Sequence, residues 1–124
     1  MQIHQSAEDY LETILMLSQR MGRVRSIDVV NELGYTKASV SIAMKKLREN
    51  GYIAVDGEGN LTLLEPGREI AERIYSRHRL LTHFFVQLGV DEAVAAEDAC
   101  KAEHILSEQT LEKIREYALL HDAE

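Results

Sequence analysis

The residues Cys100, Glu103 and His104 bring three kinds of metal-binding group together in one short stretch of the chain. If this stretch is helical, positions i, i+3 and i+4 place the thiol, the carboxylate and the imidazole on one face, one turn apart. Different donors that converge in this way allow a helix to hold a divalent cation. The alternative is that Cys100 packs in a core while Glu103 and His104 face water.

Further candidate donors lie on two other expected helices. Asp9 and Glu12 are one turn apart near the start of an amphipathic helix predicted over residues 7–21. Acidic residues at that place also complement the helix dipole, which is a purely structural explanation. His78 lies in the second half of a long helix predicted from Pro66 to about residue 88, where a histidine is more often a surface residue. Neither group by itself indicates a metal.

Residues 26–64 have the pattern of a helix-turn-helix followed by a β-hairpin. Ser26 is expected to be the N-cap of a short helix, and a second helix is expected from residue 36 or 37 to about residue 50. Two β-prone runs, 52–55 and 61–64, flank turn-forming residues and predict a hairpin. A hairpin directly after the second helix is the wing of a winged helix.

The second helix of this motif carries the residues that we predict to contact DNA. Small hydroxyl side chains crowd its N-terminal half, where a recognition helix meets base edges, and basic side chains follow. The alternative is a solvated basic face, but the hairpin that follows favours DNA. The wing tip contains Asp56 and Glu58, so we do not expect it to grip phosphate strongly. The predicted DNA-contacting residues are Thr36, Lys37, Ser39, Ser41, Ile42, Lys45 and Lys46.

The C-terminal half is expected to add two more helices. The first is predicted from Asp91 to Leu106 and is dense in alanine, which is typical of close helix packing in a core or a dimer seam. The second begins at Ser107 and is amphipathic, with Leu111, Ile114 and Tyr117 facing inward.

Composition limits the class of protein. The chain has 124 residues, of which 45% are hydrophobic and 28% charged, as expected for one or two small globular domains. No apolar run approaches the roughly 18 residues of a membrane span. Residues 1–5 lack a signal-peptide pattern, and a single cysteine excludes an internal disulfide, so we expect a cytoplasmic protein.

The net charge of −7 looks unfavourable for a nucleic-acid protein, but it is unevenly distributed. Residues 1–64 hold 7 basic and 8 acidic residues, a net charge of −1, which leaves −6 for the rest of the chain. Bound divalent cations would cancel part of the acidic charge in the C-terminal half.

The order of these motifs resembles the DtxR/MntR family of metal-dependent transcriptional repressors. The winged helix is flanked by Glu-Asp-Tyr-Leu-Glu at 8–12, Arg-His-Arg-Leu-Leu at 77–81 and Ala-Cys-Lys-Ala-Glu-His-Ile-Leu-Ser at 99–107, and the resemblance covers essentially the whole chain. It implies a winged-helix DNA-binding domain at residues 1–64 and a helical metal-binding and dimerisation domain at residues 65–124. The SH3-like domain of some members is not expected, because the sequence ends at Glu124.

The resemblance also implies a set of metal ligands. In manganese-sensing members, an acidic pair on the first helix, a histidine and a Glu…Glu-His cluster bind the metal. The first member of that cluster is Cys100 here, as in the iron-sensing branch, but that branch has methionine where this chain has Asp9. The ancillary site of that branch would need donors at Thr82 and Ala96. The implied ligands are Asp9, Glu12, His78, Cys100, Glu103 and His104.

This hybrid set leaves the metal open. Carboxylates and imidazoles suit Mn(II) and Fe(II), the expected cofactors, whereas a thiolate favours Fe(II), Co(II) and Zn(II). Both a mononuclear and a binuclear site remain open. Because each ligand must lack its proton, metal binding is expected to weaken at acidic pH. Ile42 replaces a glutamine that reads bases in the iron-sensing branch, so the resemblance carries over no operator sequence.

The expected function is that of a repressor that binds double-stranded operator DNA as a homodimer when metal is bound. The cation would tie the first helix to the dimerisation helices and so fix the spacing of the two recognition helices. One alternative is a winged-helix regulator that metal does not control. A zinc enzyme is disfavoured because the sequence shows no glycine-rich loop and no nucleophile elbow. A structural adaptor without DNA binding is the third alternative, and only the acidic net charge favours it.

Overall fold

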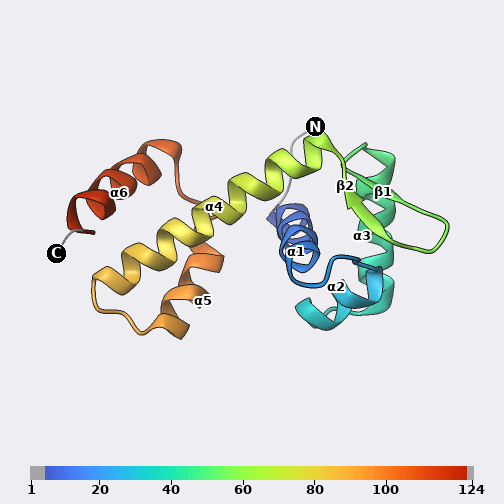
Figure 1. Ribbon diagram of the computed structural model, residues 1–124, viewed down its shortest axis with the longest axis horizontal. Coiled ribbons are helices and arrows are strands. Elements are labelled where there is room, and N and C mark those ends of the chain that lie inside the picture. The colour runs from blue at the N-terminus through green and yellow to red at the C-terminus, as the bar shows by residue number, and fades with distance from the viewer. Residues whose placement is uncertain (1–4, 123–124) are drawn as a thin grey trace. The chain divides into compact units, whose positions relative to one another are not determined.

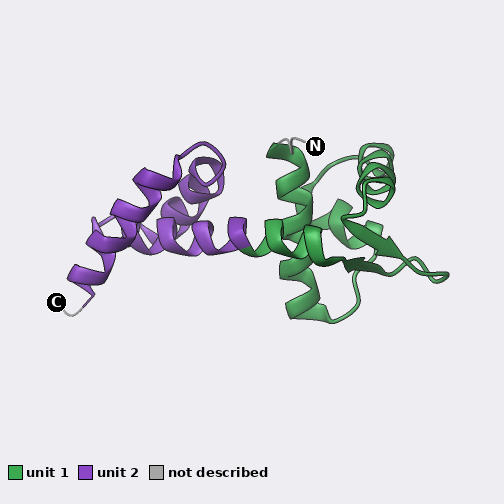
Figure 2. Ribbon diagram, turned by 90° about the horizontal axis from the view of Figure 1, so that it is seen from above, with its two compact units in different colours: residues 1–72 green, residues 73–124 purple. Residues whose placement is uncertain are grey.

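The computed structural model describes residues 5–122, and the chain divides into two compact units, residues 1–72 and 73–124 (Figure 2). The predicted lack of a signal-peptide pattern concerns residues 1–5, of which residues 1–4 lie outside the described part. The predicted fold class, mainly α with a small β-hairpin, is confirmed (Figure 1). The elements are α1 (Gln5–Met21), α2 (Ser26–Leu33), α3 (Lys37–Glu49), β1 (Ile53–Val55), β2 (Leu61–Leu63), α4 (Glu65–Gln87), α5 (Glu92–Ala102) and α6 (Glu108–His121).

Unit 1 contains the helix-turn-helix and the hairpin. α3 begins at Lys37, within the predicted start of residue 36 or 37, and Thr36 is its N-cap, whose side-chain oxygen accepts a hydrogen bond from the Ser39 N–H at 3.1 Å. Ser26, by contrast, is the first residue of α2 and not its cap. The cap is Arg25, whose backbone N–H donates to the Asp28 carboxylate at 2.9 Å and so ties the helix start from its third position.

The hairpin is short and has one buried face. β1 and β2 pair in antiparallel register, with Ile53 opposite Leu63 and Val55 opposite Leu61. Ile53, Leu61 and Leu63 are buried while Thr62 between them is exposed, which is the alternation expected of a half-buried strand. The segment before α2 joins this sheet, because the Leu61 N–H donates to the Val24 carbonyl at 2.7 Å.

Asp56 organises the wing tip between β1 and β2. Its Oδ1 accepts hydrogen bonds from the backbone N–H groups of Glu58 and Asn60, both at 2.9 Å, and its Oδ2 accepts one from the Asn60 side-chain amide. The backbone N–H and side-chain amide of Asn60 hold the pKa of Asp56 below its usual value. The acidic tip is therefore an internally bonded turn.

The beginning of α4 packs against the body of unit 1 at Gly67. The Leu64 N–H donates to the Tyr52 carbonyl at 3.0 Å, which brings the first turn of α4 close to that carbonyl. A Cβ placed on Gly67 would lie 2.2 Å from the Tyr52 oxygen and 3.3 Å from Leu11 Cδ2. Only glycine fits here. Pro66, predicted as the first residue of the helix, is its second.

Unit 2 has a small core on α4, α5 and α6. Leu81, Ala99 and Leu111 are buried there, and partly buried apolar residues such as Phe85 pack around them. Tyr117, predicted to face inward, is 44% exposed, and the next residue, Ala118, is buried in its place. Within residues 5–122, the structure has no helix of the length and apolarity that a membrane crossing requires.

Candidate metal centre and nucleic-acid interface

The residues Cys100, Glu103 and His104 do not share one continuous helix. α5 ends at Ala102, four residues before the predicted end, and Glu103 is its C-cap, whose N–H still donates to the Ala99 carbonyl at 2.9 Å. After Glu103 the chain forms a tighter turn, because the Ala102 carbonyl accepts a hydrogen bond from the Ile105 N–H, three residues on, at 3.1 Å. Residues 103–107 therefore form a bend that leads into α6, and His104 belongs to this bend.

The burial of Cys100, Glu103 and His104 contradicts the alternative that the sequence left open. That alternative placed Cys100 in the core and the other two residues in water. In the structure Cys100 is exposed, Glu103 is fully buried and the His104 side chain is 1% exposed. A fully buried glutamate is rare unless a cation or several hydrogen-bond donors compensate it, so this position calls for a charge partner.

The Glu103 carboxylate lies between two imidazoles of unit 2. His78 Nδ1 is 3.0 Å from Oε2, and His104 Nε2 is 3.4 Å from Oε1. Oε1 accepts no hydrogen bond from the described residues, although it is completely buried. A carboxylate oxygen and two imidazole nitrogens that converge in a buried place are a donor set that fits a divalent transition metal.

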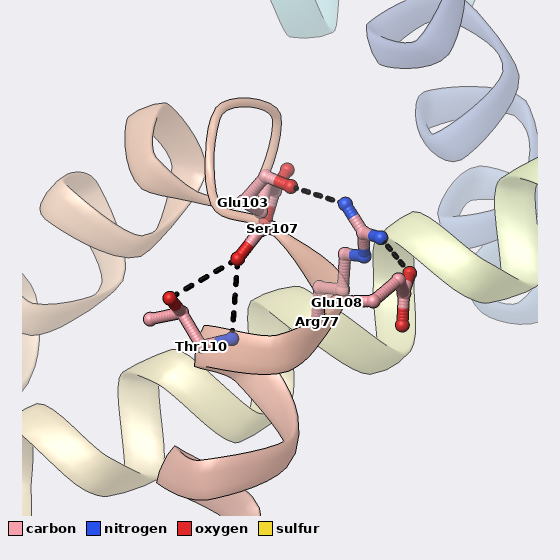
Figure 3. Close-up of polar contacts among 5 residues, drawn as sticks. All are labelled: Arg77, Glu103, Ser107, Glu108 and Thr110. Carbon is pink, nitrogen blue, oxygen red and sulfur yellow. Dashed lines mark hydrogen bonds and ion pairs between the residues drawn. The ribbon is translucent and has the colours of Figure 1, made fainter.

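The bend that carries Glu103 and His104 is held by Arg77, for which the sequence predicted no role (Figure 3). Arg77 Nη1 donates to the Glu103 backbone carbonyl at 3.2 Å, and its Nη2 forms an ion pair with Glu108, the first residue of α6. Ser107, the predicted start of the last helix, caps α6 by accepting from the Thr110 N–H at 3.2 Å. The position of Arg77 beside His78 was the available sequence signal, but a basic residue on a helix is too common to be specific.

The acidic candidates of the first helix lie in unit 1. Glu12 is 5% exposed, and Asp9, one turn earlier on α1, is half-buried. Among the described residues, Glu12 and Glu103 are the two buried carboxylates, and both are implied ligands. The structure thus singles out one glutamate in each unit, and brings His78 and His104 to the one in unit 2.

The predicted DNA-contacting residues lie on the outward face of α3 or at its start. Val40, Met44 and Leu47 are buried and fix the inward face of the helix. Ile42 is 57% exposed on the opposite side. Thr36 is occupied as the N-cap, where its hydroxyl also donates to the Ser39 oxygen at 2.9 Å. All seven predicted residues are exposed: Thr36, Lys37, Ser39, Ser41, Ile42, Lys45 and Lys46.

Two family models match consecutive parts of the chain. Residues 2–61 match the iron-dependent repressor N-terminal DNA-binding domain. Residues 64–119 match the iron-dependent repressor metal-binding and dimerisation domain. The division between the two models lies close to the start of α4, whereas the two compact units divide within α4, after residue 72.

Curated relatives agree with these matches. A helix-turn-helix transcriptional regulator of Methanocaldococcus jannaschii is 36% identical over 90% of this chain and 90% of its own length. The transcriptional regulator MntR of Escherichia coli is 31% identical over 94% of this chain and 75% of its own. The regulator MntR of Lysinibacillus sphaericus is 33% identical over 88% of this chain and 78% of its own.

Solved structures share the fold. A manganese-dependent transcriptional repressor in complex with manganese has a TM-score of 0.82 and 29% identity, over 90% of this chain and 52% of that one. The manganese regulator SloR has a TM-score of 0.78 and 25% identity, over 94% of this chain and 54% of that one. The chain therefore spans about half the length of these solved chains. Together with the curated relatives and the two family models, these matches show that the chain belongs to the DtxR/MntR family of metal-dependent transcriptional repressors.

Proposed function

We propose that this chain is a cytoplasmic repressor that binds operator DNA as a homodimer when Mn(II) or Fe(II) is bound. We propose that it controls genes of metal homeostasis. Membership of the family supports this role, and the relatives are named as transcriptional regulators, so we assign the chain no catalytic activity. The observation that carries the metal part is the burial of Glu12 and Glu103, one in each unit.

In unit 2, the proposed ligands are Glu103, His78 and His104. Their carboxylate and imidazole atoms suit Mn(II) or Fe(II), and the buried Glu103 oxygen that accepts no hydrogen bond from the described residues is where a cation would fit. A bound divalent cation would supply the positive charge that offsets the desolvation of the carboxylate. Arg77 holds the backbone of Glu103 and leaves its carboxylate for the metal.

The full proposed set adds Asp9, Glu12 and Cys100. We include Glu12 because its side chain is buried, and Cys100 because it lies three residues, about one helical turn, before Glu103. Because the set draws on both units, metal binding would couple the first helix to the dimerisation domain. That coupling would fix the spacing of two recognition helices near one turn of DNA, about 34 Å. A coupling free energy of about 1–3 kcal/mol changes operator affinity by about 5- to 150-fold.

The DNA part of the proposal rests on α3. Its exposed face carries Lys37, Lys45 and Lys46, which can neutralise phosphates, and Ser39 and Ser41, which allow a close approach to base edges. Thr36 supports this face indirectly, as the cap of the helix. Each phosphate contact should release counterions and make binding sensitive to salt.

The test measures the affinity of the full chain for a duplex selected from a random-sequence library, without metal and with Mn(II), Fe(II) or Zn(II), under anaerobic conditions. We expect Mn(II) or Fe(II) to tighten binding by about 5- to 150-fold. Isothermal calorimetry with the same metals gives the stoichiometry and the preference, and so decides between one and two ions.

Two variants make the result specific. Glu12→Gln removes a buried proposed ligand and should abolish the metal response of DNA binding. Glu97→Gln is the matched control on α5, because Glu97 is 71% exposed and forms an ion pair with the exposed Lys101. Equal operator affinity with and without metal in the unsubstituted protein would support the rival of a regulator that metal does not control.

A further inference from the structure

Ile42 occupies the centre of the outward face of α3. The buried residues Val40, Met44 and Leu47 define the inward side of this helix, and at 3.6 residues per turn Ile42 lies almost diametrically opposite their middle. Its exposed fraction of 57% is large for an isoleucine. An exposed apolar residue is common on protein surfaces, but this one stands where a recognition helix would come nearest to the bases.

The residues around Ile42 give this part of the face a defined chemistry. Ala38, one turn earlier on the same side, is also exposed and offers only a methyl group. Ala38 and Ile42 together form an apolar strip, and Lys45 and Lys46, which are also exposed, lie on either side of it. Positive charge beside the strip is complementary to the phosphates that border the major groove, so the occupant that fits the face is duplex DNA.

An apolar centre restricts which base edges can be read. Isoleucine and alanine side chains cannot make the paired hydrogen bonds that arginine makes with guanine or glutamine makes with adenine. In the major groove, the group of a base edge with which an apolar side chain makes a favourable contact is the C5-methyl of thymine. Cα atoms of residues one turn apart on a helix are separated by about 6 Å, close to two base steps of about 3.4 Å.

We propose that Ile42 and Ala38 form a methyl-reading strip that selects thymine at one or two neighbouring positions in each half of the operator. This inference rests on the proposed DNA-binding function and adds the identity of the bases that are read. The flanking Lys45 and Lys46 then contribute affinity that depends on salt and much less on sequence.

The test removes single methyl groups from the DNA. A duplex is first selected from a random-sequence library with the full chain and Mn(II), and each thymidine of a half-site is then replaced in turn by deoxyuridine. Affinities are measured by fluorescence anisotropy at one fixed salt concentration. We expect one or two positions at which loss of the methyl weakens binding about three- to fivefold, the value of one buried methyl group.

The variant Ile42→Ala assigns the effect to the side chain. At one of those positions the variant should bind thymidine and deoxyuridine DNA equally, because the contact is already lost. Ile27→Ala, which shortens another exposed isoleucine of unit 1, should keep the full sensitivity to deoxyuridine. Selection with Ile42→Gln should replace the preferred thymine by adenine, because glutamine pairs with the adenine edge.

Each outcome bears on the inference. If deoxyuridine is tolerated at every position of a well-selected duplex, or if Ile42→Ala stays as sensitive as the unsubstituted protein, the methyl-reading strip is wrong while DNA binding stands. If no sequence is enriched from the library even with Mn(II) or Fe(II), specific DNA reading fails as a whole, and the inference falls with the proposed function. Unfolding by urea should be the same for Ile42→Ala and the unsubstituted chain, because the side chain lies at the surface.

Discussion

Unit 1 and unit 2 are built on different kinds of core. Unit 1 buries large aliphatic side chains such as Leu11, Ile14 and Ile53. Unit 2 buries three large aliphatic side chains, Ile74, Leu81 and Leu111, together with alanines and a glutamate, Glu103. Large apolar side chains of unit 2 remain at its surface instead; they include Leu88, Val94, Ile105, Leu119 and Leu120.

The difference between the two cores indicates that the two units obtain their stability in different ways. Burial of aliphatic side chains is the main favourable term in folding, so unit 1 is expected to be stable through its own contacts. Each unit buries one carboxylate, Glu12 in unit 1 and Glu103 in unit 2, and each of them costs free energy. In unit 2 fewer large aliphatic side chains offset this cost, and its exposed apolar side chains would stabilise it only if a partner covered them. Unit 2 is therefore expected to gain stability from a bound metal and from a second copy of the chain, which is what a metal-binding and dimerisation domain requires.

Replacing the buried carboxylate should have the largest effect on this comparison. Glu103→Gln removes a proposed ligand and should weaken metal binding about 100-fold or more, measured by calorimetry with Mn(II). The metal-free variant should be as stable as the original chain or more so, because an uncompensated buried charge is gone. A variant that loses stability without metal and keeps its metal affinity would show that Glu103 is structural.

In unit 1, the largest effect should come from steric overlap at a fixed backbone. Gly67→Ala places a Cβ where the Tyr52 carbonyl lies and should destabilise the protein by about 1–3 kcal/mol, measured by urea unfolding. Gly57→Ala is the matched control, since a Cβ there meets no atom within 4 Å. Equal stability of the two variants would mean that the start of α4 is free to shift.

A smaller effect is expected at the exposed apolar surface of unit 2. Leu88 is 58% exposed at the end of α4, and Leu88→Ser should weaken self-association about tenfold, because a leucine contributes about 1.5–3 kcal/mol when it is buried. Sedimentation equilibrium measures this change. Met21→Ser alters a similarly exposed apolar residue of unit 1 and should leave the association constant unchanged; a comparable loss there would remove the contrast between the units.

The smallest effect is expected at the wing. Hydrogen bonds from Asn60 lower the pKa of Asp56 in the folded protein, so this carboxylate stabilises the turn above its unfolded pKa and loses that contribution as the pH falls through its folded pKa. The protection factor of the Asn60 amide, which is its intrinsic exchange rate at each pH divided by the measured rate, should then fall at acidic pH. In Asp56→Asn this protection factor should be low already, with no further fall of this kind. An Asn60 amide whose protection does not change with pH in the original chain would refute this assignment.

Local chemistry explains why much of the fold could be predicted from the sequence. The capping side chains Thr36 and Ser107 act through bonds to residues three positions on, so their sequence neighbours determine them. The hairpin likewise follows from two β-prone runs and the turn between them. The predicted extension of α5 to Leu106 was wrong because Arg77, distant in sequence, holds the carbonyl of Glu103 and the first residue of α6.

The sequence by itself determined the helix-turn-helix, the wing and the set of donor types, because periodicity, caps and residue spacing are local properties. Only the tertiary structure decided which donors are buried. It exposed Cys100 and enclosed Glu103 between His78 and His104, and it turned Ile42 outward on α3. Burial depends on which elements pack together, and side chains distant in sequence set that packing.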